Sequence, residues 1–291
     1  MPSTDEIAYT EINEAKANFD NIYTQPDPRD YFLVLGDLDY QITGQARPVF
    51  RKLIDELRQR RQSKRLKMLD LGCSYGINAA LLKFNVTLED LSERWRGADY
   101  GKMSLEERLR SDRSYFADRI ADPLLQNAGH DAASDAIDYA LKVGLLDAGF
   151  SQNLEIEDPD EDFTREIGDT DLVITTGAVG YVSDKTFNRL ADRFAAKKPW
   201  VCCFVIRMFA FEPIRECLAS HGYVTEKLEG RVFRQRRFKD EAERENVANR
   251  IREWGLDPSP EMEDGFYHAE CYLSRPKDDL DQPVGELLGG I

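Results

Sequence analysis

Apolar residues in this chain form several short continuous runs, and glycine or polar residues typical of turns follow them. Runs of this kind occupy residues 172–174 and 200–206, and a similar run at 68–71 is apolar except for Asp70. Continuous apolar strands are typical of a parallel sheet with both faces covered, whereas a half-exposed strand alternates apolar and polar residues. Segments with the period of an amphipathic helix lie between these runs. The pattern therefore predicts an α/β fold with helices on both faces of a mostly parallel sheet.

The helical segments carry apolar residues that recur every three or four positions. Residues 48–60 are the clearest case, because Val49, Leu53 and Leu57 fall on one face and most of the basic residues fall on the other. We predict further helices at residues 7–21, 132–141, 184–197 and 212–220. We predict further strands at residues 123–131, 152–157, 223–228, 231–238 and 267–273. The strands at 223–228 and 231–238 are expected to pair with each other.

Two charged segments interrupt this alternation. The segment at about 84–122 is rich in helix formers, and residues 104–107 (Ser-Leu-Glu-Glu) match the capping box that begins a helix. Residues 87–90 (Thr-Leu-Glu-Asp) resemble the same box with Asp in the last place. This first insertion is either a lid over a ligand site, or a homodimer contact or surface elaboration, and the sequence leaves both open. A second helical insertion is predicted at 240–256.

These segments divide the chain into three parts. They are an N-terminal helical extension over residues 1–62, a main domain with its two insertions over residues 63–275, and a flexible tail over residues 276–291. Six aromatic residues lie in the extension before Gly44, and they either pack the extension on the core or line a substrate pocket. They are Tyr9, Phe19, Tyr23, Tyr31, Phe32 and Tyr40.

The most informative stretch contains the end of the first apolar run and reads Asp70-Leu-Gly-Cys-Ser-Tyr-Gly76. A buried strand there meets a glycine turn, and an alanine-rich helix begins at once. Gly72 and Gly76 let the backbone adopt positive φ or pass close to a ligand, while the free amides at the start of the helix can meet a polar group. Asp70 stands at the end of the strand, where an acid can order the loop or bind a ligand. This arrangement indicates a nucleotide-binding loop.

The stretch resembles motif I of the class I S-adenosylmethionine (SAM) dependent methyltransferases, whose commonest form is Asp-Leu-Gly-Cys-Gly-Thr-Gly. The chain differs at Ser74, which replaces the middle glycine, and at Tyr75, which replaces a small residue and could stack on the cofactor or cover it. A nicotinamide or flavin site needs G-x-G-x-x-G, and Ser74 stands in place of its second glycine. The resemblance implies a doubly wound, mostly parallel seven-stranded sheet. It also implies a cofactor loop made of Asp70, Gly72, Cys73, Ser74, Tyr75 and Gly76.

The resemblance assigns cofactor contacts to three later strand ends. Asp131, in a Gly-x-Asp pattern, is the predicted ribose ligand, because a carboxylate accepts hydrogen bonds from both vicinal hydroxyls at once; its alternative role is to cap a helix. In the family, a polar residue after the third strand binds the adenine amine and its apolar neighbour packs on the ring. Asn153 and Leu154 fit that place, with Glu155 and Glu157 as alternatives. Thr176 and Gly177 are the predicted contacts after the fourth strand.

The residues that bind or activate the acceptor are less well marked. Tyr181 is predicted on the acceptor side of the loop after residues 172–174. Tyr181, His221 and His268 are candidate bases, although each is also explained by a structural role alone. A basic run near the C-terminal strands is either an anion site or the solvated face of a strand. It consists of Arg231, Arg234, Arg236 and Arg237.

Charge and cysteine content narrow the choice of partners. The 291 residues carry a formal net charge of -15, which argues against nucleic acid, because phosphate binding needs clustered Lys and Arg. Net acidity also favours a neutral or cationic small molecule over a polyanion. The five cysteines lack the spacing of metal ligands, and we predict no metal site. No apolar run has membrane-spanning length and the first residues lack a signal-peptide pattern, so we expect a cytoplasmic protein with no membrane partner.

The resemblance implies an enzyme that transfers a methyl group from SAM to an O, N or C nucleophile, and the composition favours a small-molecule metabolite as the acceptor. A non-catalytic module of the same fold, which binds SAM or a protein partner, is the first alternative, because of Ser74, Tyr75 and the missing base. A dinucleotide-dependent oxidoreductase is the second.

Overall fold

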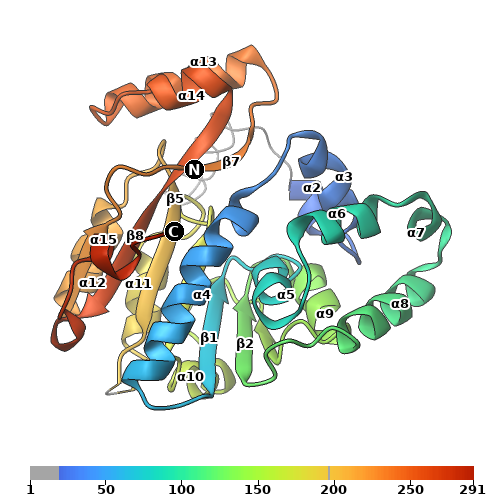
Figure 1. The fold of residues 1–291 in the computed structure, drawn as a ribbon, viewed down its shortest axis with the longest axis horizontal. Helices are drawn as coiled ribbons and strands as arrows, with labels where there is room; N and C mark the ends of the chain where they lie inside the picture. Colours follow the sequence, from blue (N-terminus) through green and yellow to red (C-terminus); the bar gives the residue numbers. More distant parts are fainter. Residues whose placement is uncertain (1–19, 196) are drawn as a thin grey trace.

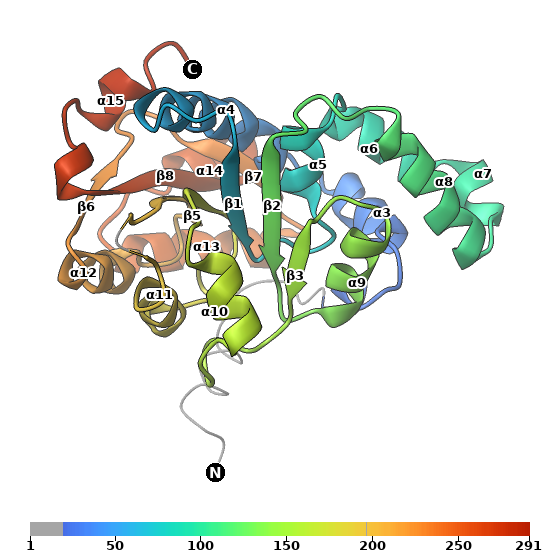
Figure 2. The same ribbon diagram turned by 90° about the horizontal axis from the view of Figure 1, so that it is seen from below.

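A computed structural model gives the structure of residues 20–195 and 197–291. Its centre is an eight-stranded sheet in the order β3-β2-β1-β4-β5-β8-β6, with β7 also paired to β8. Helices cover both faces of this sheet (Figures 1 and 2). The predicted doubly wound, mostly parallel α/β fold is confirmed, with eight strands in place of seven. The helix predicted at residues 7–21, with Tyr9 and Phe19, lies almost wholly outside the described residues.

Five strands run parallel to one another. They are β1 (Leu66–Leu71), β2 (Leu125–His130), β3 (Ala148–Phe150), β4 (Leu172–Thr176) and β5 (Trp200–Ile206). The third strand therefore precedes its predicted position at residues 152–157, which form turns instead. The side chain of Asn153 accepts a hydrogen bond from the backbone N–H of Glu155 at 3.0 Å, and such a bond favours a turn over a strand.

The remaining strands are β6 (Tyr223–Lys227), β7 (Phe233–Arg237) and β8 (Phe266–Pro276). β8 is antiparallel to β5, and β6 and β7 pair one after the other along the opposite edge of β8. The predicted pairing of 223–228 with 231–238 is therefore wrong. With eleven residues, β8 is long enough to satisfy the backbone groups of both strands.

Two helical layers enclose the sheet. Helices α4 (Ile42–Arg60) and α15 (Val284–Leu287) pack on one face, and α10 (Glu161–Ile167), α11 (Asp184–Ala191) and α12 (Glu212–Ser220) pack on the other (Figure 2). α4 begins well before its predicted start at Pro48, because burial of Ile42 and Ala46 outweighs the amide donor that the proline removes.

The first insertion is helical, as predicted. It contains α6 (Leu88–Arg96), α7 (Ala98–Lys102) and α8 (Leu105–Ala117), and complete capping boxes begin α6 at Thr87 and α8 at Ser104. The insertion packs with α2 (Asp20–Tyr23), α3 (Arg29–Asp37), α5 (Ile77–Lys83) and α9 (Ser134–Lys142) in one hydrophobic cluster. Figure 1 shows it extending beyond the β2 side of the sheet.

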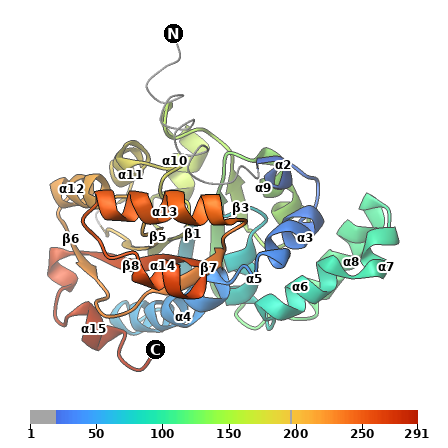
Figure 3. The ribbon, with the colours of Figure 1, turned by 90° about the horizontal axis from the view of Figure 1, so that it is seen from above.

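The C-terminal part of the chain is ordered by packing. The second insertion forms α13 (Glu241–Glu253) and α14 (Ser259–Asp264) near β7 and β8 (Figure 3). A short 3-10 helix (Lys277–Asp279) and α15 follow, and Val284, Leu287 and Leu288 are buried. The prediction of a flexible tail is therefore wrong, because these apolar side chains complete the core beneath α4. None of the described helices has the length and apolar content of a membrane span.

Candidate functional site

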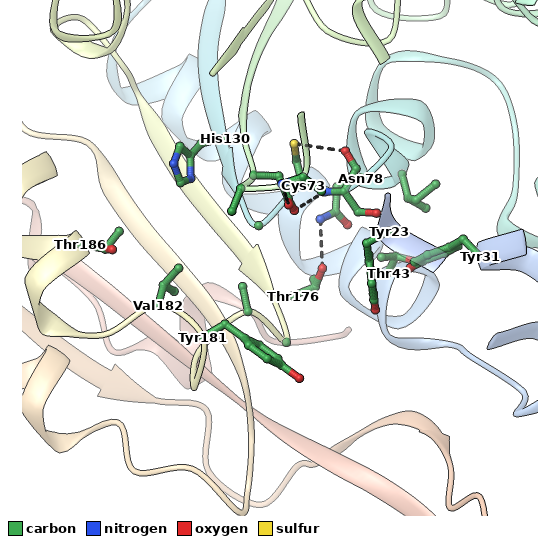
Figure 4. Close-up of a pocket in the computed structure, with 18 of the residues that line it drawn as sticks. Tyr23, Tyr31, Thr43, Cys73, Asn78, His130, Thr176, Tyr181, Val182 and Thr186 are labelled. Atoms are coloured by element: carbon green, nitrogen blue, oxygen red, sulfur yellow. Dashed lines mark hydrogen bonds between the residues drawn. The ribbon is translucent and has the colours of Figure 1, made fainter. Parts of the chain in front are cut away.

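A cavity of about 390 Å³ lies at the carboxyl ends of the parallel strands. The loops after β1, β2, β3 and β4 form one part of its wall, and residues of α2, α3, α4, α5, α11 and β7 contribute to the rest. It lies where the strand order reverses between β1 and β4, which is where open α/β sheets bind their ligands. Figure 4 shows His130 and Thr186 toward one end of the cavity and Tyr31 and Thr43 toward the other.

The loop after β1 has an unusual backbone. Gly72, Ser74 and Gly76 all adopt positive φ, at 73°, 48° and 76°. A Cβ on Gly72 would lie 2.4 Å from the Cβ of Ala178, so glycine is what allows the loop after β4 to approach. Ser74 holds a left-handed conformation that costs most residues about 1–2 kcal/mol.

Asp131 holds this loop in place. Its Oδ2 accepts a hydrogen bond from the backbone N–H of Ser74 at 2.8 Å, and its Oδ1 accepts one from the N–H of Ala133 at 2.9 Å. Each carboxylate oxygen can accept a further hydrogen bond. Asp131 lines the cavity directly after β2, so it both orders the loop and faces the cavity.

Asp70 lies behind the cavity wall. It is fully buried, and its Oδ1 accepts a hydrogen bond from Asn78 Nδ2 at 3.2 Å. Asn78 also donates to Thr176 Oγ1 at 3.1 Å and lines the cavity, so it links β1 to the end of β4 (Figure 4). Burial raises the pKa of Asp70 to about 7. Of its two predicted roles, the geometry favours ordering of the loop.

Tyr75 points away from the cavity. It is fully buried, and its hydroxyl donates to the carbonyl of Ile22 at 2.8 Å and accepts from the N–H of Gln25 at 3.1 Å. Its ring packs edge-on against Tyr31, with 5.9 Å between ring centroids. Tyr75 is therefore not positioned to stack on a cofactor. It fixes the segment that carries Tyr23 into the cavity wall.

The turn after β3 places Asn153 and Leu154 in the cavity wall, as the resemblance predicts for adenine contacts. The two alternatives are occupied elsewhere. Glu155 accepts hydrogen bonds from the N–H of Ser183 at 2.8 Å and from its hydroxyl at 2.7 Å, which fixes the start of α11. Glu157 accepts one from the N–H of Asn153 at 3.1 Å.

His130 is a neutral group in the wall. Its Nε2 lies 2.7 Å from the carbonyl oxygen of Gln152, which can only accept, so Nε2 carries the proton. Its ring stacks on Phe163 at 5.6 Å. Burial lowers the pKa of His130, and the bare Nδ1 remains an acceptor.

Several buried polar atoms in the wall have no hydrogen-bond partner among the described residues. They are Ser74 Oγ, Asn78 Oδ1, His130 Nδ1 and Gln235 Oε1. An unsatisfied buried polar group costs about 1–3 kcal/mol, so these atoms fit a polar ligand that would satisfy them. Asn78 lies on the helix that the glycine loop begins, where the motif could have indicated it. Gln235 had no local signal in the sequence.

Aromatic side chains line the other end of the cavity. Tyr23 of α2, Tyr31 of α3 and Tyr40, between α3 and α4, contribute to the wall, whereas Phe32 packs on Trp95 at 4.7 Å. Some of the N-terminal aromatic residues thus line the cavity and others pack the extension on the core, so each of the two predicted roles applies to part of the set. Burial raises the pKa of Tyr40 to about 12 and raises the pKa of Tyr23 and Tyr31 well above the ordinary value.

Tyr181 also reaches this end, from the loop after β4. Figure 4 shows Tyr23 and Tyr181 projecting toward the space beside Thr176. Gly177, with φ at 78°, continues the wall next to the side chain of Gln235. Thr176, Gly177 and Tyr181 therefore lie together in the cavity wall, as the sequence predicts.

The two candidate histidines lie elsewhere. His221 follows α12, where its Nε2 lies 2.9 Å from Asn188 Oδ1 and its carbonyl accepts from Lys198. Lys198 comes just before β5, so His221 lies at the amino edge of the sheet, opposite the cavity. His268 is buried in β8 with its Nε2 3.2 Å from the Asp264 carboxylate, and it is not part of the cavity wall.

The basic run on β7 is mostly a paired surface. Arg234 pairs with Asp264 at 2.8 Å, and Arg237 lies 3.6 Å from Asp39. Arg236 differs, because its side chain is 1% exposed and lines the cavity. The described residues contain no cluster of His, Cys, Asp and Glu that could hold a metal ion.

Solved structures similar in fold to this chain are SAM-dependent methyltransferases. A TehB-like SAM-dependent methyltransferase from Corynebacterium glutamicum is 14% identical, with 76% of this chain and 86% of that chain covered and a TM-score of 0.38. The plantazolicin methyltransferase BamL, in complex with a triazolic desmethylPZN analog and SAH, is 12% identical, with 93% and 100% covered and a TM-score of 0.43. A SAM dependent methyltransferase from Aquifex aeolicus is 12% identical, with 75% and 88% covered and a TM-score of 0.36. No protein-family model matches the sequence, and no curated protein is significantly similar to it.

Proposed function

We propose that this protein is an enzyme that transfers a methyl group from SAM to a nucleophilic atom of a small-molecule acceptor. One observation carries the proposal. The carboxylate of Asp131, at the end of β2, receives the backbone N–H of Ser74 from the glycine loop that resembles motif I. The two groups that the resemblance assigns to cofactor binding thus meet in one cavity wall.

The chain's own residues fit the parts of SAM, which supplies a methyl group activated on a sulfonium centre. The free oxygen lone pairs of Asp131 would accept from the ribose hydroxyls. Asn153 and Leu154 would bind the edge and face of adenine. Asn78 and Gly177 would meet the methionine end, where the Asn78 side-chain oxygen lacks a partner.

The cavity's contribution to the reaction would be alignment and exclusion of water. Holding two reactants in line converts a bimolecular step into one within a single complex. Tyr75 does not obstruct the cavity, so the departure from the family pattern at this position does not by itself prevent cofactor binding. Measurement of methyl transfer distinguishes this proposal from a non-catalytic module, because such a module would bind SAM without transferring its methyl group.

Calorimetric titration with S-adenosylhomocysteine (SAH) tests the cofactor, with NAD as the control. We expect micromolar binding of SAH alone. The Asp131→Ala variant should weaken SAH binding by about 1.5–3 kcal/mol, or roughly 10- to 150-fold, because hydrogen bonds to a charged group are lost. Asp138→Ala, an exposed position on α9, is the matched control. Unchanged affinity in Asp131→Ala would remove this residue from the site, and failure of the folded protein to bind SAH would reject the methyltransferase proposal.

A further inference from the structure

The acceptor half of the cavity is formed by Tyr23, Tyr31, Tyr40, Tyr181, Gln235 and Arg236. Each of these side chains carries a hydrogen-bond donor, and the Tyr31 hydroxyl donates to Tyr40. Burial keeps the pKa of Tyr23, Tyr31 and Tyr40 above the ordinary tyrosine value, so these hydroxyls stay protonated at neutral pH. This part of the cavity is therefore rich in neutral donors.

Among the described residues, the same half holds no carboxylate and no imidazole that could act as a general base. The carboxylates and the imidazole in the cavity wall belong to Asp131, Glu155 and His130. All three lie toward the cofactor half and are engaged by backbone groups or by Ser183. An alcohol, an amide or a carbon acid must lose a proton before or during methylation, and none of the described carboxylates or imidazoles lies in this half to take it.

Arg236 gives this half a positive end. Its guanidinium donates to the Glu243 carboxylate at 3.1 Å and 2.8 Å. Arg236 lines the cavity and Glu243 does not, so the pair presents its cationic end to an acceptor. A cationic amine is disfavoured beside this end, whereas an anion is favoured.

We propose that the acceptor is a small carboxylic acid with a flat apolar body, and that the product is its methyl ester; this inference rests on the proposed methyltransferase function. A carboxylate is already ionised at neutral pH, because its pKa is ordinarily near 4. It also accepts hydrogen bonds from several donors at once. The tyrosine rings offer apolar faces for the rest of the molecule.

The reaction balances without a base. A carboxylate oxygen forms a C–O bond with the methyl carbon, the S–C bond breaks, and its electron pair stays on sulfur. No proton moves, and the two reacting charges are neutralised. Walls made of aromatic rings favour this step, since excluding water strengthens the attraction between opposite charges.

Binding to the protein–SAH complex tests the substrate class with three matched probes. Phenylacetate, phenylacetamide and phenethylamine share one body and differ in charge. We expect calorimetry to show that phenylacetate binds at least tenfold more tightly than the other two. Equal binding of the three, or tighter binding of phenethylamine, would overturn the inference.

The chemistry of the product gives a second test. The protein is incubated with SAM carrying a tritiated methyl group and a small-molecule cell extract, and the labelled products are treated with alkali. A methyl ester releases its label as volatile methanol, which is the expected result. Label that resists alkali would overturn the carboxylate inference and leave methyl transfer standing. Absence of SAH binding would instead reject the proposed function itself.

A single variant tests whether the tyrosines bind the acceptor through their hydroxyls or only by apolar packing of their rings. Tyr23→Phe keeps the ring and removes one donor from the acceptor half. It should weaken phenylacetate binding about tenfold and leave SAH affinity unchanged. Tyr115→Phe, at a ring that packs outside the cavity against Arg94 and Arg119, should change neither. Unchanged phenylacetate affinity in Tyr23→Phe would assign the tyrosines to packing alone and overturn the role of their hydroxyls.

Discussion

Ser74 shows how one residue combines strain with a binding role. Its φ of 48° lies in the left-handed region, yet its N–H must point at Asp131. Because an L-residue there costs about 1–2 kcal/mol and an added glycine costs about 0.5–1 kcal/mol in chain entropy, Ser74→Gly should raise the free energy of unfolding by up to about 1.5 kcal/mol. Urea unfolding measures this change.

Ser74→Ala is the control for the hydroxyl, since it keeps both the Cβ and the strained backbone. We expect its unfolding midpoint to stay close to that of the natural protein. A lower midpoint for Ser74→Gly would mean that the strain at this position is smaller than its φ suggests. SAH binding should survive Ser74→Gly, because the backbone donor to Asp131 is retained.

Asp70 is the residue whose ionisation should make stability depend on pH. Burial raises its pKa from 3.8 to about 7, so between these values the folded protein holds a proton that the unfolded chain releases. The free energy of unfolding must therefore fall as pH rises from about 4 to 7, and the loss is complete above 7. Asp70→Asn removes this titration and keeps an acceptor for Asn78.

We expect Asp70→Asn to be more stable than the natural protein at pH 8, by about 1–4 kcal/mol, and to lose much of the advantage at pH 5. Urea unfolding midpoints of both proteins at the two pH values measure this advantage. Other groups titrate alike in the two proteins, so their contribution cancels when the two stabilities are subtracted. Parallel pH profiles for the two proteins would show that Asp70 is already ionised in the folded state.

At the scale of elements, the insertion of α6, α7 and α8 supports the cavity from outside. None of its described residues lines the cavity. Trp95 instead packs on Phe32 of α3, the helix that carries Tyr31 into the wall. The geometry therefore favours an insertion that supports the N-terminal part of the cavity wall over one that closes the cavity as a lid.

Asp112 connects this insertion to the main domain. The Oδ2 of its buried carboxylate accepts hydrogen bonds from Trp95 Nε1 at 3.2 Å, from the Tyr100 hydroxyl at 2.7 Å and from the Tyr139 hydroxyl of α9 at 2.6 Å. Its other oxygen accepts from Arg94 at 2.7 Å. Asp112→Ala leaves these donors unpaired, so we expect a loss of about 3–5 kcal/mol of stability.

Hydrogen exchange should quicken across residues 88–117 in Asp112→Ala, while SAH affinity of the folded variant stays within about threefold, which is only about 0.7 kcal/mol. Asp112→Asn keeps the size of the side chain and serves as the milder companion. A tenfold loss of SAH affinity in either folded variant would contradict this supporting role of the insertion and favour a lid.

At the scale of the whole molecule, the parts predicted well are those fixed by nearby residues. The glycine loop and Asp131 each follow a buried strand directly, so their place at one sheet edge follows from the parallel order. Gln235 and Arg236 could not be placed in this way. They reach the cavity because β7 pairs with β8 across an intervening insertion, with an irregular register.

The net charge of the molecule predicts the charge of the acceptor less well than the local geometry of the cavity does. The net charge of -15 favours a neutral or cationic acceptor over a polyanion. The acceptor half of the cavity holds donors and the cationic end of the Arg236–Glu243 pair. Net charge governs the approach of a ligand through solvent, whereas these contacts govern which single charge is tolerated once it has arrived.

The C-terminal residues complete the core, although the sequence analysis predicts a flexible tail there. Leu287 is 3% exposed beneath α4, and the carbonyl of Gly289 accepts from Lys52 at 2.7 Å. Leu287→Ala should therefore lower the free energy of unfolding by about 2–5 kcal/mol, as a buried leucine does when it leaves a cavity. Glu286→Ala, at the exposed neighbouring position, should change it by less than about 0.5 kcal/mol. Equal stability of the two variants would mean that the segment detaches in solution, whereas the expected difference would make these residues part of the folding unit that holds α4 against the sheet.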